Sequence, residues 1–196
     1  MNEPEPGLRA RLVDVGVDLV TREGAQALTL REIARRAGVS HGAPRRYFPT
    51  HLELLSAIAR RGFEELASEA AGVTEATGDG MADPRAQLTA LGRRYLGFAL
   101  GNRGMYELMF RHDILESGHL GLRGTSLPLF DRLVDLVGRV RPDVDARAVA
   151  GALWANLHGI AQLWGWGSLQ LATGADDFTP LLRAALDAHL GPETAV

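Results

Sequence analysis

The sequence predicts an all-α protein of about nine helices. Apolar residues recur at intervals of three and four along most of the 196-residue chain, which is the period of an amphipathic helix. No run alternates apolar and polar residues between turn signals, as a half-buried strand would. Glycine, proline and capping residues divide the pattern into segments of helical length. We therefore expect helices packed against helices, with an N-terminal three-helix domain followed by a larger helical domain.

The first predicted helix begins near residue 8 and ends near Gly24. Glycine is common just after the last turn of a helix, because it tolerates a positive φ angle. The apolar positions of this segment are Leu8, Leu12, Val15, Leu19 and Val20. Their spacing predicts that the helix buries one face.

Two short helices are predicted next, joined by the tetrapeptide AGVS. Thr29 is expected to cap the first, "LREIARRA", with Glu32 completing a capping box. Gly38 can adopt the positive φ that reverses the chain, and Val39 is expected to drop into the core of the turn. Ser40 is then expected to cap the second helix, "HGAPRRYF". The first helix should bury Leu30, Ile33, Ala34 and Ala37 and expose Arg31, Arg35 and Arg36.

The remaining helices follow the same signals. Pro49 ends the third helix, and Thr50 caps a long fourth one. The stretch "GVTEATGDGMAD", residues 72–83, is glycine-rich and polar, so we expect a loop or hinge there. Pro84 then begins a second set of helices, expected at 84–101, 103–112, 120–140, 144–171 and 178–190. The expected organisation is an N-terminal domain at 1–50, a connecting helix at 51–72 and a C-terminal domain at 73–196.

The two short helices have the layout of a helix-turn-helix, in which the second helix lies in the major groove of DNA. The segment "LTLREIARRAGVSHGAPRRYFPTHLELLSAI" resembles the DNA-binding segment of the TetR family of one-component transcriptional regulators. The resemblance covers residues 8–55 and rests on the threonine cap, the "IA..AGVS" turn, the "YF" pair and the leucines that follow. It implies a homodimer that binds a palindromic, double-stranded DNA operator, usually as a repressor.

Candidate DNA-binding residues follow from this layout. The start of the recognition helix is expected to face base edges, and its arginines to contact phosphates or, at guanine, bases. Phe48 is expected in the core, and Arg9 and Arg11 are left undecided. The expected DNA-binding residues are Thr29, Ser40, His41, Gly42, Ala43, Arg45, Arg46, Tyr47 and His51. The alternative for each arginine is a solvated helix face, and we favour that alternative for Arg35 and Arg36.

Two positions depart from the family pattern. Relatives commonly have an aromatic residue where this chain has Arg45, and often a lysine where it has His51. The resemblance implies that both positions contact backbone phosphates. Arginine can make that contact bidentately, whereas histidine is mostly neutral near pH 7. We therefore expect Arg45 to make the contact at least as well as the usual aromatic residue, and His51 to make a weaker or pH-dependent one.

Composition favours the same function and excludes others. Residues 1–62 hold ten arginines and seven acidic residues, whereas the whole chain has a formal net charge of −3. A basic N-terminal module on an acidic body is typical of a nucleic-acid binder. The chain has no cysteine, so disulfides and thiolate metal sites are excluded. No signal peptide, membrane span or catalytic motif is evident, so we expect a cytoplasmic protein that is not an enzyme and needs no cofactor.

The C-terminal part is expected to bind an effector, a small molecule of largely apolar or aromatic character, because aromatics and a few polar groups gather there. The segment "LWANLHGIAQLWGWG" resembles the Trp-His-Gly type of TetR C-terminal domain. The expected ligand-binding residues are Tyr95, Phe98, Tyr106, Met109, Phe110, His112, Trp154, His158 and Trp164, with Asn156 and Gln162 as further polar candidates. The alternative is that each is an ordinary core residue, including His158.

Two further expectations concern assembly and metal binding. The resemblance implies dimerisation through the last two long helices, as a four-helix bundle. The residues expected to supply that surface are Ala148, Ala152, Leu153, Ala155, Leu181, Leu182, Ala185, Leu186 and His189. His112, Glu116 and His119 lie close in sequence, but Gly118 interrupts the helix and no further ligand cluster is evident, so no metal site is expected. A small-molecule binding protein without operator binding, and a helical enzyme, are the competing functions.

Overall fold

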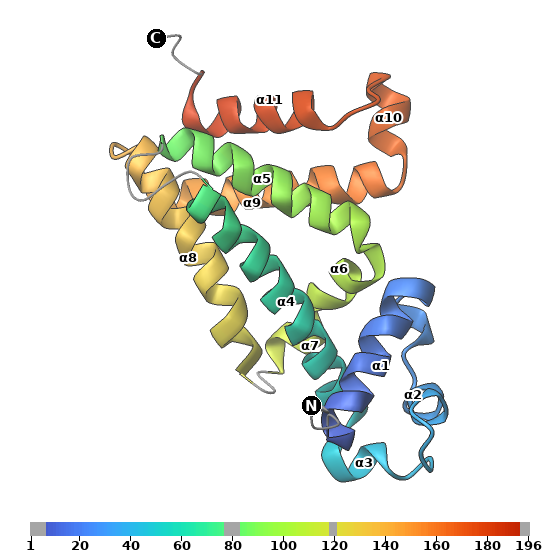
Figure 1. Ribbon diagram of the computed structural model, residues 1–196. Coiled ribbons are helices and arrows are strands. Elements are labelled where there is room, and N and C mark those ends of the chain that lie inside the picture. Colours follow the sequence, from blue (N-terminus) through green and yellow to red (C-terminus); the bar gives the residue numbers. More distant parts are fainter. Residues whose placement is uncertain (1–6, 77–82, 118–120, 193–196) are drawn as a thin grey trace. The chain divides into compact units, whose positions relative to one another are not determined.

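The computed structural model describes residues 7–76, 83–117 and 121–192. Within those ranges the protein has eleven α-helices, one turn of 3-10 helix and no strand. Figure 1 shows how the α-helices follow one another along the chain. The α-helices are α1 Leu8–Glu23, α2 Leu30–Arg36, α3 Pro44–Tyr47, α4 His51–Ala76, α5 Pro84–Gly101, α6 Arg103–Met109, α7 His112–Glu116, α8 Leu122–Val140, α9 Ala146–Gly165, α10 Ser168–Thr173 and α11 Thr179–Leu190. The 3-10 turn, η1, is Ala25–Ala27. The predicted all-α class is confirmed.

The chain divides into two compact units. The first unit comprises residues 1–65 and 102–125, and the second unit comprises residues 66–101 and 126–196. Helix α4 begins in the first unit and continues into the second. Helices α6 and α7 therefore belong with the N-terminal helices.

The core of the first unit is built where α1, α2 and α4 face one another. Leu12, Leu19, Ile33, Leu54 and Ile58 are all fully buried there. Helix α1 has a glycine, Gly16, at a point of close approach, because a Cβ added there would lie closer than 3.0 Å to the Ile58 side chain. The sequence pattern of α1 and α4 thus produces one apolar centre that supports the short helices α2 and α3.

Helix α6 packs against the end of α1 in the same unit. A Cβ on Gly104 would lie closer than 3.0 Å to the carbonyl oxygen of Val20, so only glycine permits this approach. Phe110 follows α6 and packs edge-to-face against Phe63 and Tyr106, with ring centroids 5.6 and 4.9 Å apart. These aromatic pairs stabilise the interior of the first unit.

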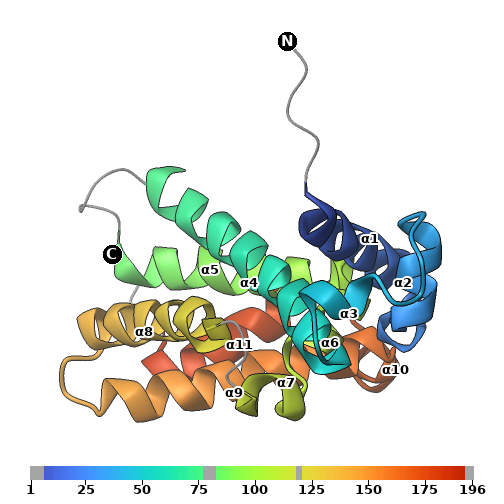
Figure 2. The same cartoon turned by 90° about the horizontal axis from the view of Figure 1, so that it is seen from below.

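The second unit is organised around α5, α9 and α11, which lie side by side in Figures 1 and 2. Leu96 on α5, Leu153 on α9 and Leu182 on α11 are almost completely buried between them. Helices α5 and α11 approach closely at Gly92, where an added Cβ would lie 2.7 Å from Leu182 Cδ1. Packing of these helices encloses a second apolar core.

Several predicted helix bounds were wrong. The helix expected at 103–112 ends at Met109, because Arg111 has extended backbone angles (φ −66°, ψ 128°) and starts the separate helix α7. The helix expected at 144–171 divides at Gly167, whose φ of 79° is left-handed. Helix α3 begins at Pro44 rather than at residue 41. The predicted loop at 72–83 overlaps α4, which continues to Ala76, and residues 77–82 lie outside the described ranges.

Across the described residues, none of the helices combines the length and the apolar character that crossing a lipid bilayer requires.

Candidate DNA-binding interface

Thr29 begins the helix-turn-helix by capping α2. Its Oγ1 accepts a hydrogen bond of 3.1 Å from the backbone N–H of Glu32, as predicted. The reciprocal half of the capping box is wrong, because the backbone N–H of Thr29 donates to Ala27 and the Glu32 carboxylate turns to the two arginines of α2. The cap therefore fixes the start of α2 through the hydroxyl alone.

Arg35 and Arg36 are held in ion pairs. Arg35 donates to both carboxylate oxygens of Glu32, at 2.9 and 2.6 Å, and Arg36 donates to Glu32 at 2.7 Å and also binds Glu23. Hydrogen bonds from Arg35 and then Arg36 lower the pKa of Glu32 to about 2. The charge of these two arginines is thus matched by acids of the same unit.

The turn after α2 reverses the chain at Gly38, whose φ is 68°, as predicted. The N–H of Val39 returns to the carbonyl of Ala34 at 3.0 Å, and Val39 is half-buried rather than enclosed. The expectation that Ser40 caps α3 is wrong. The carbonyl of Ser40 accepts from Ala43 in a separate turn, and Ala43 precedes Pro44, the first helical residue.

Helix α3 has a buried side and an exposed side. Pro44 and Phe48, four residues apart, are buried, and Phe48 is only 1% exposed. Arg45, Arg46 and Tyr47 therefore face solvent, with Tyr47 43% exposed. In the turn that leads into α3, Ser40, His41 and Gly42 are exposed and Ala43 is half-buried.

Arg45 and Arg46 differ from the arginines of α2 in their pairing. Neither makes an ion pair or a hydrogen bond with the described part of the chain. An arginine with no acidic partner can bind a phosphate without first breaking an ion pair. The exposed face of α3 therefore carries two arginines whose charge is not matched by an acid among the described residues.

His51, at the start of α4, is anchored to the chain. Its Nε2 lies 2.8 Å from the carbonyl oxygen of Leu28. A carbonyl oxygen only accepts, so Nε2 carries the proton and Nδ1 of the neutral ring is an acceptor. Thr50 caps the same helix end, with its Oγ1 accepting from the N–H of Glu53 at 3.1 Å. The cap was predicted, whereas the bond to Leu28 was not.

Arg9 on α1 is a further residue of this region that the sequence left undecided. Its guanidinium lies 5.0 Å from the centroid of the Phe48 ring, within the range of a cation–π contact. Arg9 itself is exposed. The contact holds a cation next to the end of α3. An arginine and an aromatic residue far apart in sequence give no periodic signal, so this placement is visible only in the fold.

The expected ligand-binding residues fall into both units. In the first unit, Tyr106 and Met109 are buried, Phe110 is half-buried, and His112 is 88% exposed. The members in the second unit are Tyr95, Phe98, Trp154, His158 and Trp164. Asn156 lies 3.4 Å from His189 across α9 and α11, and Gln162 is half-buried.

Three of these residues form a hydrogen-bonded chain in the second unit. The indole N–H of Trp154 donates to the hydroxyl oxygen of Tyr95 at 3.1 Å, and that hydroxyl lies 3.0 Å from His158 Nδ1. Burial lowers the pKa of His158, which favours the neutral imidazole and makes Nδ1 an acceptor for the tyrosine proton. Hydrogen bonds thus connect Tyr95 on α5 with Trp154 and His158 on α9, which are three of the expected ligand-binding residues.

The expected dimer interface on α9 and α11 was partly wrong, because several of its residues are not on the surface. Leu153, Leu182, Ala185 and Leu186 are buried within the second unit, so they cannot pair with another chain. Helical periodicity alone does not tell which apolar face is used internally. The expected interface residues that stay exposed are Ala148, Ala152 and Ala155, and Leu163 and Trp166 are exposed further along the chain.

No metal centre is found among the described residues. His112 Nε2 lies 3.3 Å from Glu116 as an exposed pair on α7. His119 and Gly118 lie outside the described ranges.

Comparison with known proteins matches both halves of the chain. Residues 12–58 match the model of bacterial regulatory proteins of the tetR family, and residues 88–189 match the tetracyclin repressor-like C-terminal domain. The second match spans more than half of the chain.

Individual relatives agree with these matches. The HTH-type transcriptional regulator BetI of Rhizobium meliloti (strain 1021) is 36% identical over 87 residues, which cover 44% of this chain and 41% of BetI. The HTH-type transcriptional repressor KstR of Rhodococcus jostii (strain RHA1) is 37% identical over 60 residues, covering 31% of this chain and 28% of KstR. The chain thus spans less than half the length of these two relatives.

A solved structure matches along nearly the whole chain. It is a protein of unknown function from Rhodococcus sp. RHA1, with a TM-score of 0.74 and 26% identity. The match covers 96% of this chain and 97% of that one.

Proposed function

The chain belongs to the TetR family of DNA-binding transcriptional regulators, and we propose that it is a homodimeric repressor released from a palindromic operator by a small-molecule effector. The observation that carries the proposal is the exposed face of α3. There Arg45 and Arg46 face solvent without an acidic partner in the described chain. A transcriptional regulator of this family is not an enzyme, and its operator would place it in the cytoplasm.

On this proposal, the turn before α3 and the helix itself make different kinds of contact with the DNA. Ser40, His41, Gly42 and Ala43 approach base edges, while Arg45, Arg46 and Tyr47 contact the backbone. Thr29 and His51 add contacts at the starts of α2 and α4. Backbone contacts hold the register of the protein on the duplex, and base contacts select its sequence.

Dimerisation is proposed through α9 and α11. Ala148, Ala152 and Ala155 lie on the exposed side of α9, and small side chains permit close packing of helices. Leu163 and Trp166, 40% and 61% exposed, extend the apolar surface toward the end of α9. A two-fold dimer of this kind would present two recognition helices about 34–36 Å apart, one turn of DNA.

The proposed effector site is in the C-terminal helices. We assign α9 to the Trp-His-Gly type, with Trp154, His158 and Gly159 as the pattern residues. The hydrogen-bonded Tyr95, His158 and Trp154 would supply the polar contacts for an otherwise apolar or aromatic molecule. Release requires that the effector bind one conformer of the dimer more tightly than the operator-binding conformer.

Fluorescence anisotropy with labelled DNA tests the regulator function. We expect saturable binding to a palindromic segment flanking the protein's own gene, with two chains per site. Affinity should fall as salt rises, because phosphate contacts release counterions. Absence of binding to every palindrome in that DNA, at low and at high salt, would instead favour the second candidate, a small-molecule binding protein without an operator.

A further inference from the structure

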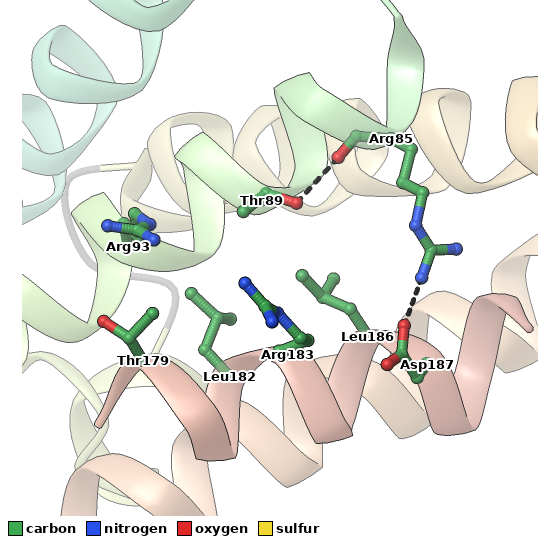
Figure 3. A pocket seen from close by; sticks show the side chains of 8 residues that line it. All are labelled: Arg85, Thr89, Arg93, Thr179, Leu182, Arg183, Leu186 and Asp187. Atoms are coloured by element: carbon green, nitrogen blue, oxygen red, sulfur yellow. Dashed lines mark hydrogen bonds and ion pairs between the residues drawn. The ribbon is translucent and has the colours of Figure 1, made fainter. Parts of the chain in front are cut away.

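A small pocket lies between α5 and α11, both in the second unit. Its volume is about 180 Å³. Figure 3 shows its walls, with Arg85 and Arg93 on α5 and Arg183 and Asp187 on α11. Neither the DNA contacts nor the proposed effector residues include any of these side chains.

The pocket has an excess of positive charge. Three arginines and one aspartate line it, for a formal net charge of +2. Arg85 binds Asp187, as the dashed line in Figure 3 marks, and the Arg85 side chain is only 14% exposed. This ion pair lies at one end of the pocket. Its aspartate, Asp187, is the one acidic residue in the pocket lining.

Figure 3 shows Arg93 at the other end of the pocket and Arg183 in the middle of it, between Leu182 and Leu186. Neither arginine has a hydrogen bond or an ion pair to the parts of the chain that the structure describes. The carboxylate of Asp177 accepts a hydrogen bond from Thr179, which lowers its pKa, and the charge of Arg93 contributes weakly to that lowering. Figure 3 shows Arg183 extending from α11 toward α5.

The floor of the pocket is apolar. Leu182 and Leu186 line it, and they are 1% and 3% exposed. Arg93 and Arg183 themselves are exposed, so an ion from solvent can reach them. The close approach of α5 and α11 at Gly92 keeps the two walls together.

We propose that this pocket binds a small oxyanion, a phosphate or carboxylate group, between Arg93 and Arg183. Guanidinium groups bind both kinds of oxyanion bidentately. Drug-sized ligands occupy pockets of about 300–1,000 Å³, so a volume of about 180 Å³ fits an anionic group and not such a whole molecule. The ligand is inorganic phosphate or the charged end of a metabolite, and its charge joins α5 to α11.

Isothermal titration calorimetry of the full chain without DNA tests the site. Inorganic phosphate and succinate are titrated separately, with sodium chloride at matched ionic strength as the reference. We expect saturable binding of at least one of them at one site per chain. Binding of phosphate alone would identify a phosphate site, and binding of succinate alone a carboxylate site.

Variants separate the pocket from general surface charge. Arg183→Gln and Arg93→Gln should each weaken binding at least ten-fold. Arg94→Gln removes a neighbouring exposed arginine of α5 that does not line the pocket, and it should leave binding unchanged.

Circular dichroism melts of all variants establish that each is folded. No saturable binding of either anion to the folded wild-type chain, or equal loss in Arg94→Gln, would overturn the proposal. Operator binding is measured in a separate experiment. Failure of the anion site can therefore be told apart from failure of the proposed regulator function.

Discussion

The Nε2 atom of His51 donates a 2.8 Å hydrogen bond to the carbonyl oxygen of Leu28. This bond connects the start of α4 to the residue that precedes the Thr29 cap, so it links two elements of the helix-turn-helix. It also fixes the tautomer of the ring. Neutral His51 presents Nδ1 as an acceptor, which cannot bind a phosphate oxygen, whereas the protonated ring presents an N–H donor there.

Replacement of His51 tests its proposed contact with DNA. We expect His51→Gln to weaken operator binding about two- to ten-fold, since one phosphate contact is lost. Anisotropy titrations at constant ionic strength measure the dissociation constant. Unchanged affinity in the folded variant would contradict the contact.

Replacement of Arg45 distinguishes backbone contact from base reading. We expect Arg45→Ala to weaken binding to all DNA sequences and to reduce the slope of log K against log salt by about 0.9, the contribution of one phosphate. Arg35→Ala is the control, because Arg35 is already paired with Glu32. Altered sequence preference with an unchanged salt slope would show that Arg45 reads bases. The same comparison applies to Arg46.

The Glu32 cluster predicts a pH dependence of stability. The pKa of Glu32 is lowered from 4.5 to about 2 in the folded chain by its hydrogen bonds to Arg35 and Arg36. A lowered folded-state pKa stabilises the fold above the unfolded value, and this stabilisation is lost as the pH falls from about 4.5 to about 2. Urea unfolding between pH 7 and 2.5 should therefore show a smaller decline in Glu32→Gln than in the wild type. Parallel curves for the two proteins would exclude this contribution.

Gly104 is expected to be intolerant of any side chain. A Cβ there would meet the backbone carbonyl of Val20, which cannot rotate away as a flexible side chain can. Gly104→Ala should lower the free energy of unfolding by about 1–3 kcal/mol through overpacking. Gly97→Ala is the matched control, because it lies in a helix with no atom within 4 Å of the added Cβ, and it should stabilise by about 0.5–1 kcal/mol. Equal effects at both positions would contradict the close approach.

A charged substitution tests the proposed dimer surface. Ala152→Arg on the exposed side of α9 should convert the dimer to a monomer, since a cation would be placed on each side of a two-fold axis. Size-exclusion chromatography with light scattering measures the mass. Ala86→Arg, at an exposed position of α5, should leave the assembly unchanged. A wild-type chain that is monomeric at all concentrations would reject the interface.

Much of the fold was predictable because the signals are local. Caps at Thr29 and Thr50 and the reversal at Gly38 depend on residues within four positions, and the structure has all three. The break between α6 and α7 was not predictable, because no glycine or proline marks it and Arg111 adopts its extended angles in the packed unit. Ser40 failed as a cap for a related reason, since the residues after it form a separate turn before Pro44.

The sequence by itself determined the helical class and the helix-turn-helix, since periodicity, caps and turn residues are properties of neighbouring positions. Membership of the TetR family rests on similarity to known proteins over residues 12–58 and 88–189. Only the tertiary structure decided which arginines are available. Arg36 is paired with Glu23 13 positions away, whereas Arg45 and Arg46 face solvent. It also decided the bond from His51 to Leu28, 23 positions apart, and the ion pair of Arg85 with Asp187, 102 positions apart. Such pairs form because distant helices are packed together, and the spacing of residues along the chain does not encode which side chains then meet.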